Sequence, residues 1–251
     1  MFAFQDDRAP VAVAFTDRHG GVSTGPYASL NLADSGGDDP AAVAENQRRA
    51  VGSFTGGLDA PVARLRQVHG ADVTVVDQRY VDQYREVPAG HAERPAADGV
   101  VTALPGVVLM VRVADCVPLL LADTDHGIVG AAHAGRSGMV AGVVASTVAR
   151  MRQLGAERLV GWVGPHVCGR CYEVPEQMRA DVARVVPESY AETSWGTPAV
   201  DVGAGVRAQL RASGVEVVDA ARCTLEDHDL FSYRRQGKAS GRLAGLVWVR
   251  P

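Results

Sequence analysis

The sequence has no long hydrophobic run and few cysteines. No apolar stretch approaches the roughly 20 residues that a membrane-spanning helix needs. Residues 1–15 lack the charged leader, apolar core and cleavage site of a signal peptide. Four unevenly spaced cysteines in 251 residues do not resemble a disulfide framework. We therefore expect a cytoplasmic protein in a reducing compartment, without a membrane partner.

An excess of positive charge is also missing. The 29 Asp and Glu residues outnumber the 25 Lys and Arg residues, giving a formal net charge of −4 and a pI near 6.0. Proteins that bind nucleic acid usually carry a basic surface, so we expect no nucleic-acid partner, although a local basic site fits this balance. With 47% hydrophobic and 22% charged residues, the chain has ample material for a core.

No internal repeat or low-complexity linker divides the chain, and strand and helix patterns alternate only loosely. We expect one α/β domain over residues 1–251 with mixed sheets, not a regular parallel doubly wound sheet. Residues 78–97 are polar with scattered prolines and predict a long loop that covers a site. Strands are predicted at 11–15, 62–68, 73–76, 107–113, 117–122, 128–132, 158–163, 215–218 and 243–249. Helices are predicted at 41–51, 135–154, 175–186 and 201–212.

The stretch 107–154 places reactive residues inside near-continuous apolar sequence. Cys116 lies between two apolar runs, and His133 follows a third. Such runs are typical of a sheet buried on both faces, where functional groups lie at strand ends. Cys116 and His133 are therefore candidate site residues.

His69 is a third candidate, because it follows the strand expected at 62–68 and stands beside a glycine. One thiolate and two imidazoles suit zinc, and three protein ligands leave a fourth position for water or substrate. The same side chains could form a cysteine–histidine nucleophilic pair without metal. A lone histidine is more often a structural residue than a ligand. Spacing alone leaves these possibilities open.

A second cysteine pattern, Cys168-x-x-Cys171, is conspicuous. A redox pair normally opens a helix, whereas Tyr-Glu-Val-Pro delays the helix here. A zinc knuckle needs a second ligand pair at similar spacing, and the sequence shows none. We therefore favour neither a redox nor a structural zinc role for this pair.

Seven motifs occur together in one order along the chain. As a set they closely resemble the laccase-domain (multicopper polyphenol oxidase-like) family, over nearly the whole length. The motifs are Gly-Gly-Val-Ser at 20–23, Ser-Leu-Asn-Leu at 29–32, Gln-Val-His-Gly at 67–70, Ala-Asp-Cys at 114–116, His-Ala-Gly at 133–135, Cys-Tyr-Glu-Val at 171–174 and Ser-Tyr-Arg-Arg at 232–235.

The resemblance implies a layered α/β/β/α fold with mixed sheets. It also implies a zinc-dependent purine nucleoside phosphorylase for adenosine, inosine, guanosine and 5′-methylthioadenosine, with accessory adenosine deaminase activity. The metal and catalytic residues would be His69, Cys116 and His133. The residues placed near the substrate would be Arg18, Asn31, Gln67 and Arg234.

The chain departs from this family at one motif. Relatives commonly read His-Ala-Gly-Trp-Arg-Gly, whereas residues 133–138 read His-Ala-Gly-Arg-Ser-Gly. The expected helix N-terminus at 135–138 favours an anion, and Arg136 adds a charge-assisted contact, so we expect phosphate to bind here. Cys168 is also a local variant, since it replaces a usual glycine. Our mechanistic hypothesis is that one zinc ion serves both phosphorolysis at the ribose and water attack on adenine C6.

Two other enzyme classes and a binding module are alternatives. Copper-dependent phenol oxidation needs histidines in His-x-His pairs, and none of the seven histidines forms one, so we discount copper. A metal-free hydrolase could edit peptidoglycan precursors with a Cys116–His133 pair, and metal dependence would separate it from the phosphorylase. A binding module does not explain why cysteine and histidine terminate core strands.

Overall fold

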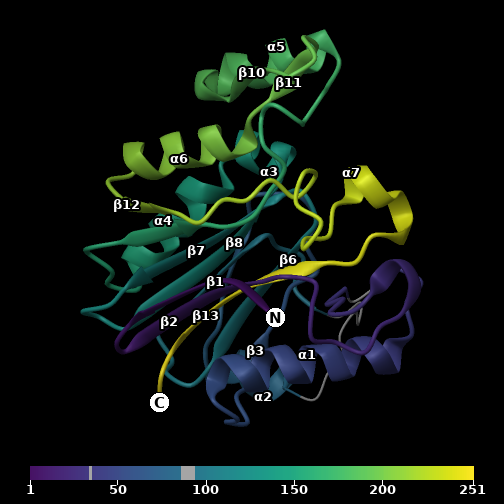
Figure 1. The fold of residues 1–251 in the computed structure, drawn as a ribbon. Coiled ribbons are helices and arrows are strands. Elements are labelled where there is room, and N and C mark those ends of the chain that lie inside the picture. The colour runs from purple at the N-terminus through teal and green to yellow at the C-terminus, as the bar shows by residue number, and fades with distance from the viewer. Residues whose placement is uncertain (34–35, 86–93) are drawn as a thin grey trace.

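Two β-sheets stack face to face between two layers of helices (Figure 1). The computed structural model describes residues 1–33, 36–85 and 94–251. The chain starts and ends in the same sheet, so both termini lie on one side of the stack. The arrangement confirms the expected mixed α/β fold, with the order helix, sheet, sheet, helix across the molecule.

The first sheet, sheet I, has the strand order β1-β2-β13-β6-β3. Its neighbours are antiparallel except β3, which runs parallel to β6. The strands are β1 (Phe2–Arg8), β2 (Val11–Thr16), β13 (Leu243–Val249), β6 (Val108–Val113) and β3 (Val62–Ala63).

The second sheet, sheet II, has the order β12-β9-β7-β8-β5-β4. The two outer pairs, β12 with β9 and β5 with β4, are parallel, and the inner pairs are antiparallel. The strands are β12 (Glu216–Asp219), β9 (Val160–Val163), β7 (Val117–Asp123), β8 (Ile128–Ala134), β5 (Gly99–Thr102) and β4 (Val73–Val75). A separate hairpin joins β10 (Tyr190–Glu192) to β11 (Pro198–Val200).

One helix covers the outer face of sheet I, and a group of helices covers sheet II. The helices are α1 (Pro40–Thr55), α2 (Gln78–Tyr84), α3 (Arg136–Ala141), α4 (Val143–Gln153), α5 (Glu176–Val185), α6 (Val202–Ala212) and α7 (Tyr233–Gln236). The α1 helix packs Phe54 against Trp248 of sheet I, with ring centroids 6.1 Å apart. The α3, α4 and α6 helices bury the face of sheet II that points away from sheet I. Among the described residues, no helix has both the length and the apolar character needed to cross a membrane.

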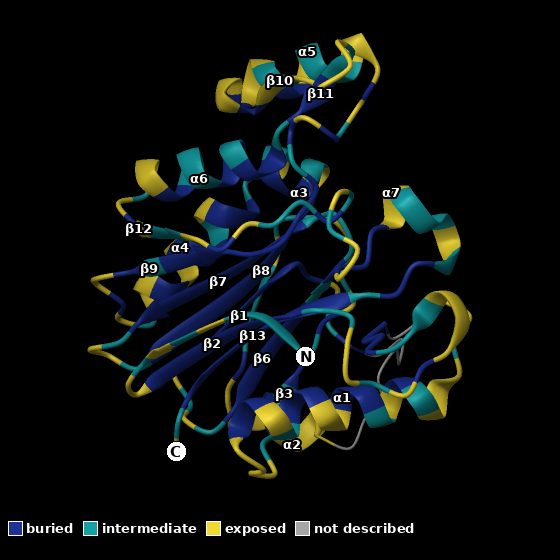
Figure 2. Cartoon of the chain, in the orientation of Figure 1, coloured by how far each residue is buried: buried dark blue, intermediate teal, exposed yellow. Residues whose placement is uncertain are grey.

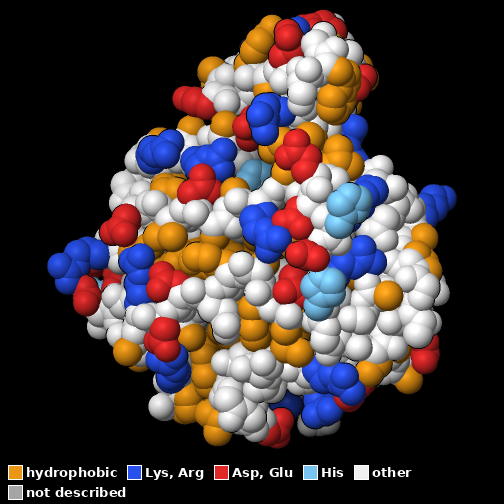
Figure 3. Space-filling view, in the orientation of Figure 1, with side chains coloured by type: hydrophobic (Ala, Val, Ile, Leu, Met, Phe, Trp, Pro, Cys, Tyr) orange, Lys and Arg blue, Asp and Glu red, His pale blue; other side chains and the backbone are white. Residues whose placement is uncertain are grey.

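One core lies between the two sheets, and two others lie between each sheet and its covering helices. Every residue of β7, β8 and β13 is buried (Figure 2), which explains why these strands are apolar throughout. Trp162 of β9 is fully buried between the sheets, and its indole nitrogen donates to Asp6 at 2.9 Å. Each large side chain buried in this way contributes roughly 1.5–3 kcal/mol to folding. On the face drawn in Figure 3, acidic and basic side chains are interspersed.

Several predicted elements are shorter or divided. The strand expected at 62–68 is limited to β3, because the chain turns away to bring His69 to the site. The helix expected at 135–154 breaks at Gly142, whose φ is +89°, into α3 and α4. The loop expected at 78–97 begins with α2, which is capped by Asp77. Residues 86–93 of that expected loop lie outside the described residues.

Candidate metal centre and active-site cavity

The structure brings His69, Cys116 and His133 together. One ligand atom from each lies within 4.8 Å of the other two. Cys116 Sγ is 3.9 Å from His69 Nε2, and the two imidazole rings have centroids 4.7 Å apart at an interplanar angle of 77°. His133 is buried, Cys116 is half-buried and His69 is exposed, so the group is reachable from one side.

The chain delivers these side chains from three different local structures. His133 is the penultimate residue of β8, and Cys116 immediately precedes β7. His69 lies in a turn rather than at a strand end, so that prediction was wrong. His69 and Asp115 have φ angles of +61° and +84°. Left-handed backbone costs a non-glycine residue about 1–3 kcal/mol and tends to gather at functional sites.

Asp98 connects two of the candidate ligands. Its Oδ1 accepts hydrogen bonds from His133 Nδ1 at 2.7 Å and from the His69 N–H at 3.0 Å. Its Oδ2 accepts from the N–H groups of Val68 and Gly70 at 3.1 and 2.7 Å. Burial acts to raise the pKa of Asp98, but the bonds from His133 and the backbone outweigh it and lower that pKa. One buried carboxylate therefore orients His133 and holds the turn that carries His69.

Gly135 allows the ligands to approach one another. The β7–β8 register pairs Val117 with Ala134, so Cys116 and Gly135 come next along the two strands. A Cβ atom at Gly135 would lie 2.9 Å from Cys116 Sγ and 2.9 Å from His69 Cδ2. Any side chain at this position would displace both groups.

The electrostatics of the group favour a thiolate. Burial raises the pKa of the Cys116 thiol, but the charge of His133 and hydrogen bonds from both histidines outweigh it and lower the pKa to about 6. Burial lowers the pKa of His133, whereas the Cys116 thiolate and Asp98 raise it to about 9. Between these values, without metal, the pair is a thiolate beside an imidazolium. Metal ligation and nucleophilic attack both require the thiolate.

This donor set fits a zinc ion. Zinc accepts sulfur and imidazole nitrogen ligands, whereas magnesium and calcium prefer oxygen. The Nδ1 atom of His133 is bonded to Asp98, which leaves Nε2 for a metal. A carboxylate behind a ligating histidine is the usual support in zinc proteins.

The three residues form part of the wall of a cavity of about 940 Å³. Besides the two histidines, the described residues that line it include six arginines and one carboxylate, that of Asp115. The local charge is thus positive although the chain is acidic overall, which favours an anionic ligand. The arginines are Arg66, Arg94, Arg112, Arg136, Arg234 and Arg242.

Three of the five predicted substrate residues line this cavity. Gln67 donates to the Arg112 carbonyl and accepts from the Arg112 N–H, at 2.8 and 2.9 Å. The Arg234 guanidinium donates to the Glu173 carbonyl at 2.7 Å and lies 4.5 Å from the ring centroid of Tyr172. Arg136 is half-buried, and its side chain makes no hydrogen bond or ion pair with another described residue. Its guanidinium is therefore available for a ligand.

The other two predicted substrate residues are not among the described residues of the cavity lining. Arg18 donates to the Ala28 carbonyl at 2.7 Å, and its guanidinium stacks on Phe231 at 4.6 Å. Asn31 is fully buried. Its side-chain NH2 group donates to the Asp38 carboxylate, and its side-chain oxygen accepts from the N–H of Arg242. Both side chains serve internal contacts here, and their contact with substrate stays a prediction.

Sequence reasoning missed several residues of the site. Asp98 stands in the sequence Ala97-Asp98-Gly99 at the start of β5. A carboxylate beside a glycine at a strand end was an available signal for a residue that supports a metal ligand. Arg112 projects from an otherwise apolar strand, and burial lowers its pKa to about 10. Its position inside a hydrophobic run was an available signal. Tyr233 stands in the Ser-Tyr-Arg-Arg motif at 232–235, although only Arg234 of that motif was assigned a role, whereas Arg242 lies in the C-terminal segment and carries no local signal.

Comparisons with known proteins agree over almost the entire chain. A family model described as "Multi-copper polyphenol oxidoreductase laccase" matches residues 12–250. The protein named purine nucleoside phosphorylase ORF3 from Streptomyces griseus is 56% identical over 240 residues, covering 94% of this chain and 93% of its own. The Corynebacterium glutamicum purine nucleoside phosphorylase Cgl2154/cg2365 is 46% identical over 243 residues, covering 96% and 95%. The crystal structure of Neisseria meningitidis protein NMB0706 matches with a TM-score of 0.83 and 32% identity, over 99% of both chains.

Proposed function

This chain belongs to the multi-copper polyphenol oxidoreductase laccase family, and from that premise we propose that it is a zinc-dependent purine nucleoside phosphorylase. Residues 1–251 would form one cytoplasmic catalytic domain acting on adenosine, inosine, guanosine and 5′-methylthioadenosine, with an adenosine deaminase side activity. The supporting observation is a His69, Cys116 and His133 group beside an arginine-lined cavity, in a chain 56% identical to a protein named purine nucleoside phosphorylase.

The proposal assigns zinc to His69, Cys116 and His133. Bound zinc would supply a Lewis acid next to the substrate. The protein's part is to hold the three donors in place and keep Cys116 deprotonated. Asp98 holds His133 and the turn that carries His69 in place. The imidazolium form of His133 stabilises the Cys116 thiolate before metal binds.

Phosphate would bind among the arginines. Arg234 and Arg112 already donate to backbone carbonyls, so they contribute mainly their positive field. Arg136 has no described partner and offers a two-pronged contact to a phosphate oxygen pair. We assign Arg136 as the principal phosphate contact. In the family pattern that the sequence resembles, this position is commonly tryptophan and the arginine comes one place later, so here the charge is shifted by one residue and the aromatic surface is lost.

The reaction would displace the base by phosphate. A phosphate oxygen forms a bond to the ribose anomeric carbon, the bond from that carbon to purine N9 breaks, and the purine leaves with the electron pair and takes up a proton. Arginine contacts and the cavity walls would hold phosphate and nucleoside in line, which converts an encounter of two reactants into a reaction within one complex. The apolar part of the lining suits the base, and its members are Leu65, Val113, Val167 and Val202.

A metal-free cysteine hydrolase acting on peptidoglycan precursors is the second candidate. The thiolate–imidazolium pair of Cys116 and His133 favours it, because this pair is the nucleophile and acid of cysteine hydrolases. Copper-dependent phenol oxidation has weaker support. The two groups of possible metal ligands among the described residues contain only two histidines between them, His69 and His133.

Product analysis separates these functions. Purified protein would be loaded with zinc or stripped with a chelator, then incubated with inosine or adenosine with and without phosphate. We expect phosphate-dependent release of hypoxanthine and adenine by the zinc form, and slow formation of inosine from adenosine without phosphate. Cys116→Ala should abolish both reactions. Phosphorolysis that persists in a zinc-free sample would refute the assignment of zinc.

A further inference from the structure

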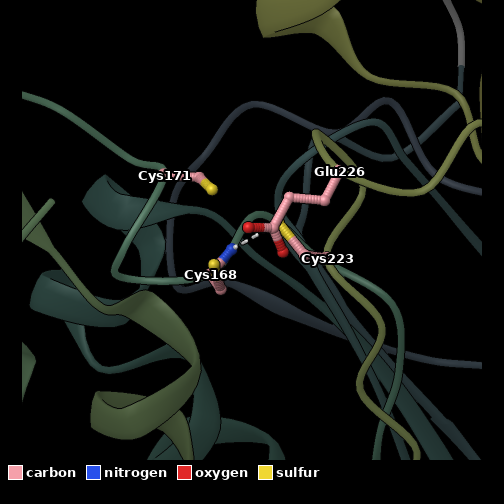
Figure 4. A group of neighbouring side chains, drawn as sticks. All are labelled: Cys168, Cys171, Cys223 and Glu226. Carbon is pink, nitrogen blue, oxygen red and sulfur yellow. Dashed lines mark hydrogen bonds between the residues drawn. The ribbon is translucent and has the colours of Figure 1, made fainter. Parts of the chain in front are cut away.

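A second group of metal-binding side chains lies outside the cavity. Cys168, Cys171, Cys223 and Glu226 each offer one ligand atom, and these atoms lie within 4.8 Å of one another. Figure 4 shows Cys168 and Cys171 on one loop facing Cys223 and Glu226 on another. None of the four lines the cavity described above. The proposed phosphorylase function does not use them.

Sheet topology explains why residues over 50 positions apart meet here. The β9 and β12 strands are parallel neighbours at the edge of sheet II, so the loops that follow them leave the sheet at the same end. The pairing then continues beyond the strands. The His166 N–H donates to the Arg222 carbonyl at 3.1 Å, and the Thr224 N–H donates to the His166 carbonyl at 3.0 Å. Cys223 is thereby fixed beside the loop that carries Cys168.

The two loops supply ligand pairs with the same spacing. Cys168-x-x-Cys171 is matched by Cys223-x-x-Glu226, so the second pair that the sequence pattern did not show is provided by the fold. In the first loop, the N–H of Cys171 donates to the Cys168 carbonyl at 3.0 Å, which folds the pair into a tight turn. A turn of this spacing places two ligands on one metal ion.

Burial and the neighbouring thiols raise the pKa of Cys168 and Cys171, so these two thiols need a bound metal ion to become thiolates, whereas one contact favours the thiolate of Cys223. The backbone N–H of Cys168 points at Cys223 Sγ from 3.5 Å (Figure 4), and such a contact stabilises negative charge on sulfur. Cys171 is buried, Cys168 and Cys223 are half-buried, and Glu226 is exposed, so an ion can reach the group from the Glu226 side. Three cysteines cannot all be satisfied by one disulfide, whereas three thiolates and a carboxylate complete a tetrahedral zinc site.

We propose that Cys168, Cys171, Cys223 and Glu226 bind one structural zinc ion, distinct from the metal held by His69, Cys116 and His133. All four zinc positions would be filled by protein, which is the pattern of a structural rather than a catalytic site.

This ion would fix part of the cavity wall. Tyr172 directly follows Cys171, lines the cavity and packs against the guanidinium of Arg234. On the second loop, Arg235 donates to the carbonyls of Thr224 and Leu225 at 2.8 and 2.9 Å. The zinc ion would therefore hold both loops against α7, which carries Arg234 and Arg235.

Zinc content measured in the full chain tests this proposal. The Cys116→Ala variant removes a ligand from the first group, and it should retain one zinc ion per chain. Adding Cys223→Ala should remove that ion, and adding Glu226→Gln should weaken its retention against a chelator at least 10-fold. The matched control adds Glu188→Gln instead, which changes an exposed carboxylate outside both groups and should leave the ion in place.

A second measurement does not depend on further cysteine variants. X-ray absorption at the zinc edge of the Cys116→Ala protein should show three sulfur ligands at about 2.3 Å. Its three remaining thiols should react with a thiol reagent only after a chelator is added. A folded Cys116→Ala protein that holds no zinc would overturn the proposal. So would a Cys168–Cys171 disulfide, or three thiols that react freely in the presence of zinc.

Discussion

Replacing Asp98 with asparagine tests the support behind the candidate metal centre. The side chain keeps its size but exchanges one acceptor oxygen for an NH2 group. In the best orientation, the remaining oxygen keeps the bonds from His133 and His69. The new NH2 group then faces the N–H groups of Val68 and Gly70, which lose their acceptor.

The magnitude follows from these contacts. Two hydrogen bonds to a charged acceptor are lost, at about 1.5–3 kcal/mol each, so the free energy of unfolding should fall by about 3–6 kcal/mol. Because support of a ligating histidine is weakened, zinc affinity should also fall by about 10–100-fold. The pKa of Asp98 is lowered in the folded protein, so its contribution is present at neutral pH and is lost as pH falls through that pKa. The stability difference between wild type and variant should therefore shrink in acid.

Asp123→Asn is the matched control. Asp123 is also fully buried, and its carboxylate accepts from His126 Nδ1 at 3.0 Å and from the Glu157 N–H at 2.7 Å. It belongs to neither group of possible metal ligands. Urea unfolding should show a loss of stability in both variants, whereas competition with a zinc chelator should show weaker binding only in Asp98→Asn. Equal zinc affinity in both variants would refute the role given to Asp98.

Three further predictions concern the same site. Gly135→Ala should reduce zinc affinity by at least about 10-fold, because the added Cβ displaces Cys116. The control Gly52→Ala, whose Cβ would meet no atom within 4 Å, should leave zinc affinity unchanged. Equal zinc retention in the two variants would contradict the packing argument. In zinc-free protein, the rate of Cys116 alkylation should increase with pH through an apparent pKa of about 6, and zinc should block the reaction. A midpoint near the ordinary thiol value of about 8.5 would contradict the ion pair between Cys116 and His133. Arg136→Ala should raise the KM for phosphate about 10-fold with little change in the KM for the nucleoside. The control Arg150→Ala, on the exposed face of α4, should leave both KM values unchanged. An unchanged phosphate KM in Arg136→Ala would remove Arg136 from the phosphate site.

The positions of the buried strands could be predicted because their hydrophobic pattern is strong. β13 was predicted at its observed bounds, and the helix expected at 41–51 is α1, which begins at Pro40 and continues to Thr55. The N-terminal strand β1 was missed, because its polar C-terminal half, Gln5 to Arg8, suits an edge strand but does not resemble the buried strands. The break at Gly142 was also missed, since the apolar periodicity continues through it.

The candidate site was only partly predictable, because convergence depends on strand pairing that spacing does not reveal. Cys116 and His133 stood out as reactive residues in apolar runs, and their proximity follows from the β7–β8 register. The second cysteine group shows the limit most clearly. Cys223 and Glu226 approach Cys168 only because β9 and β12 are adjacent parallel strands, and nothing near residue 168 indicates that pairing.

Phosphate dependence in a zinc-defined sample is the most direct test of the proposed activity. Wild-type protein carrying measured zinc would be given inosine, with hypoxanthine followed by chromatography as phosphate is varied, alongside the Cys116→Ala variant. The account predicts hypoxanthine and ribose 1-phosphate in equal amounts from the zinc form, with no product from the variant. Hypoxanthine release that is independent of phosphate, or equal in Cys116→Ala, would contradict a phosphorylase built on His69, Cys116 and His133.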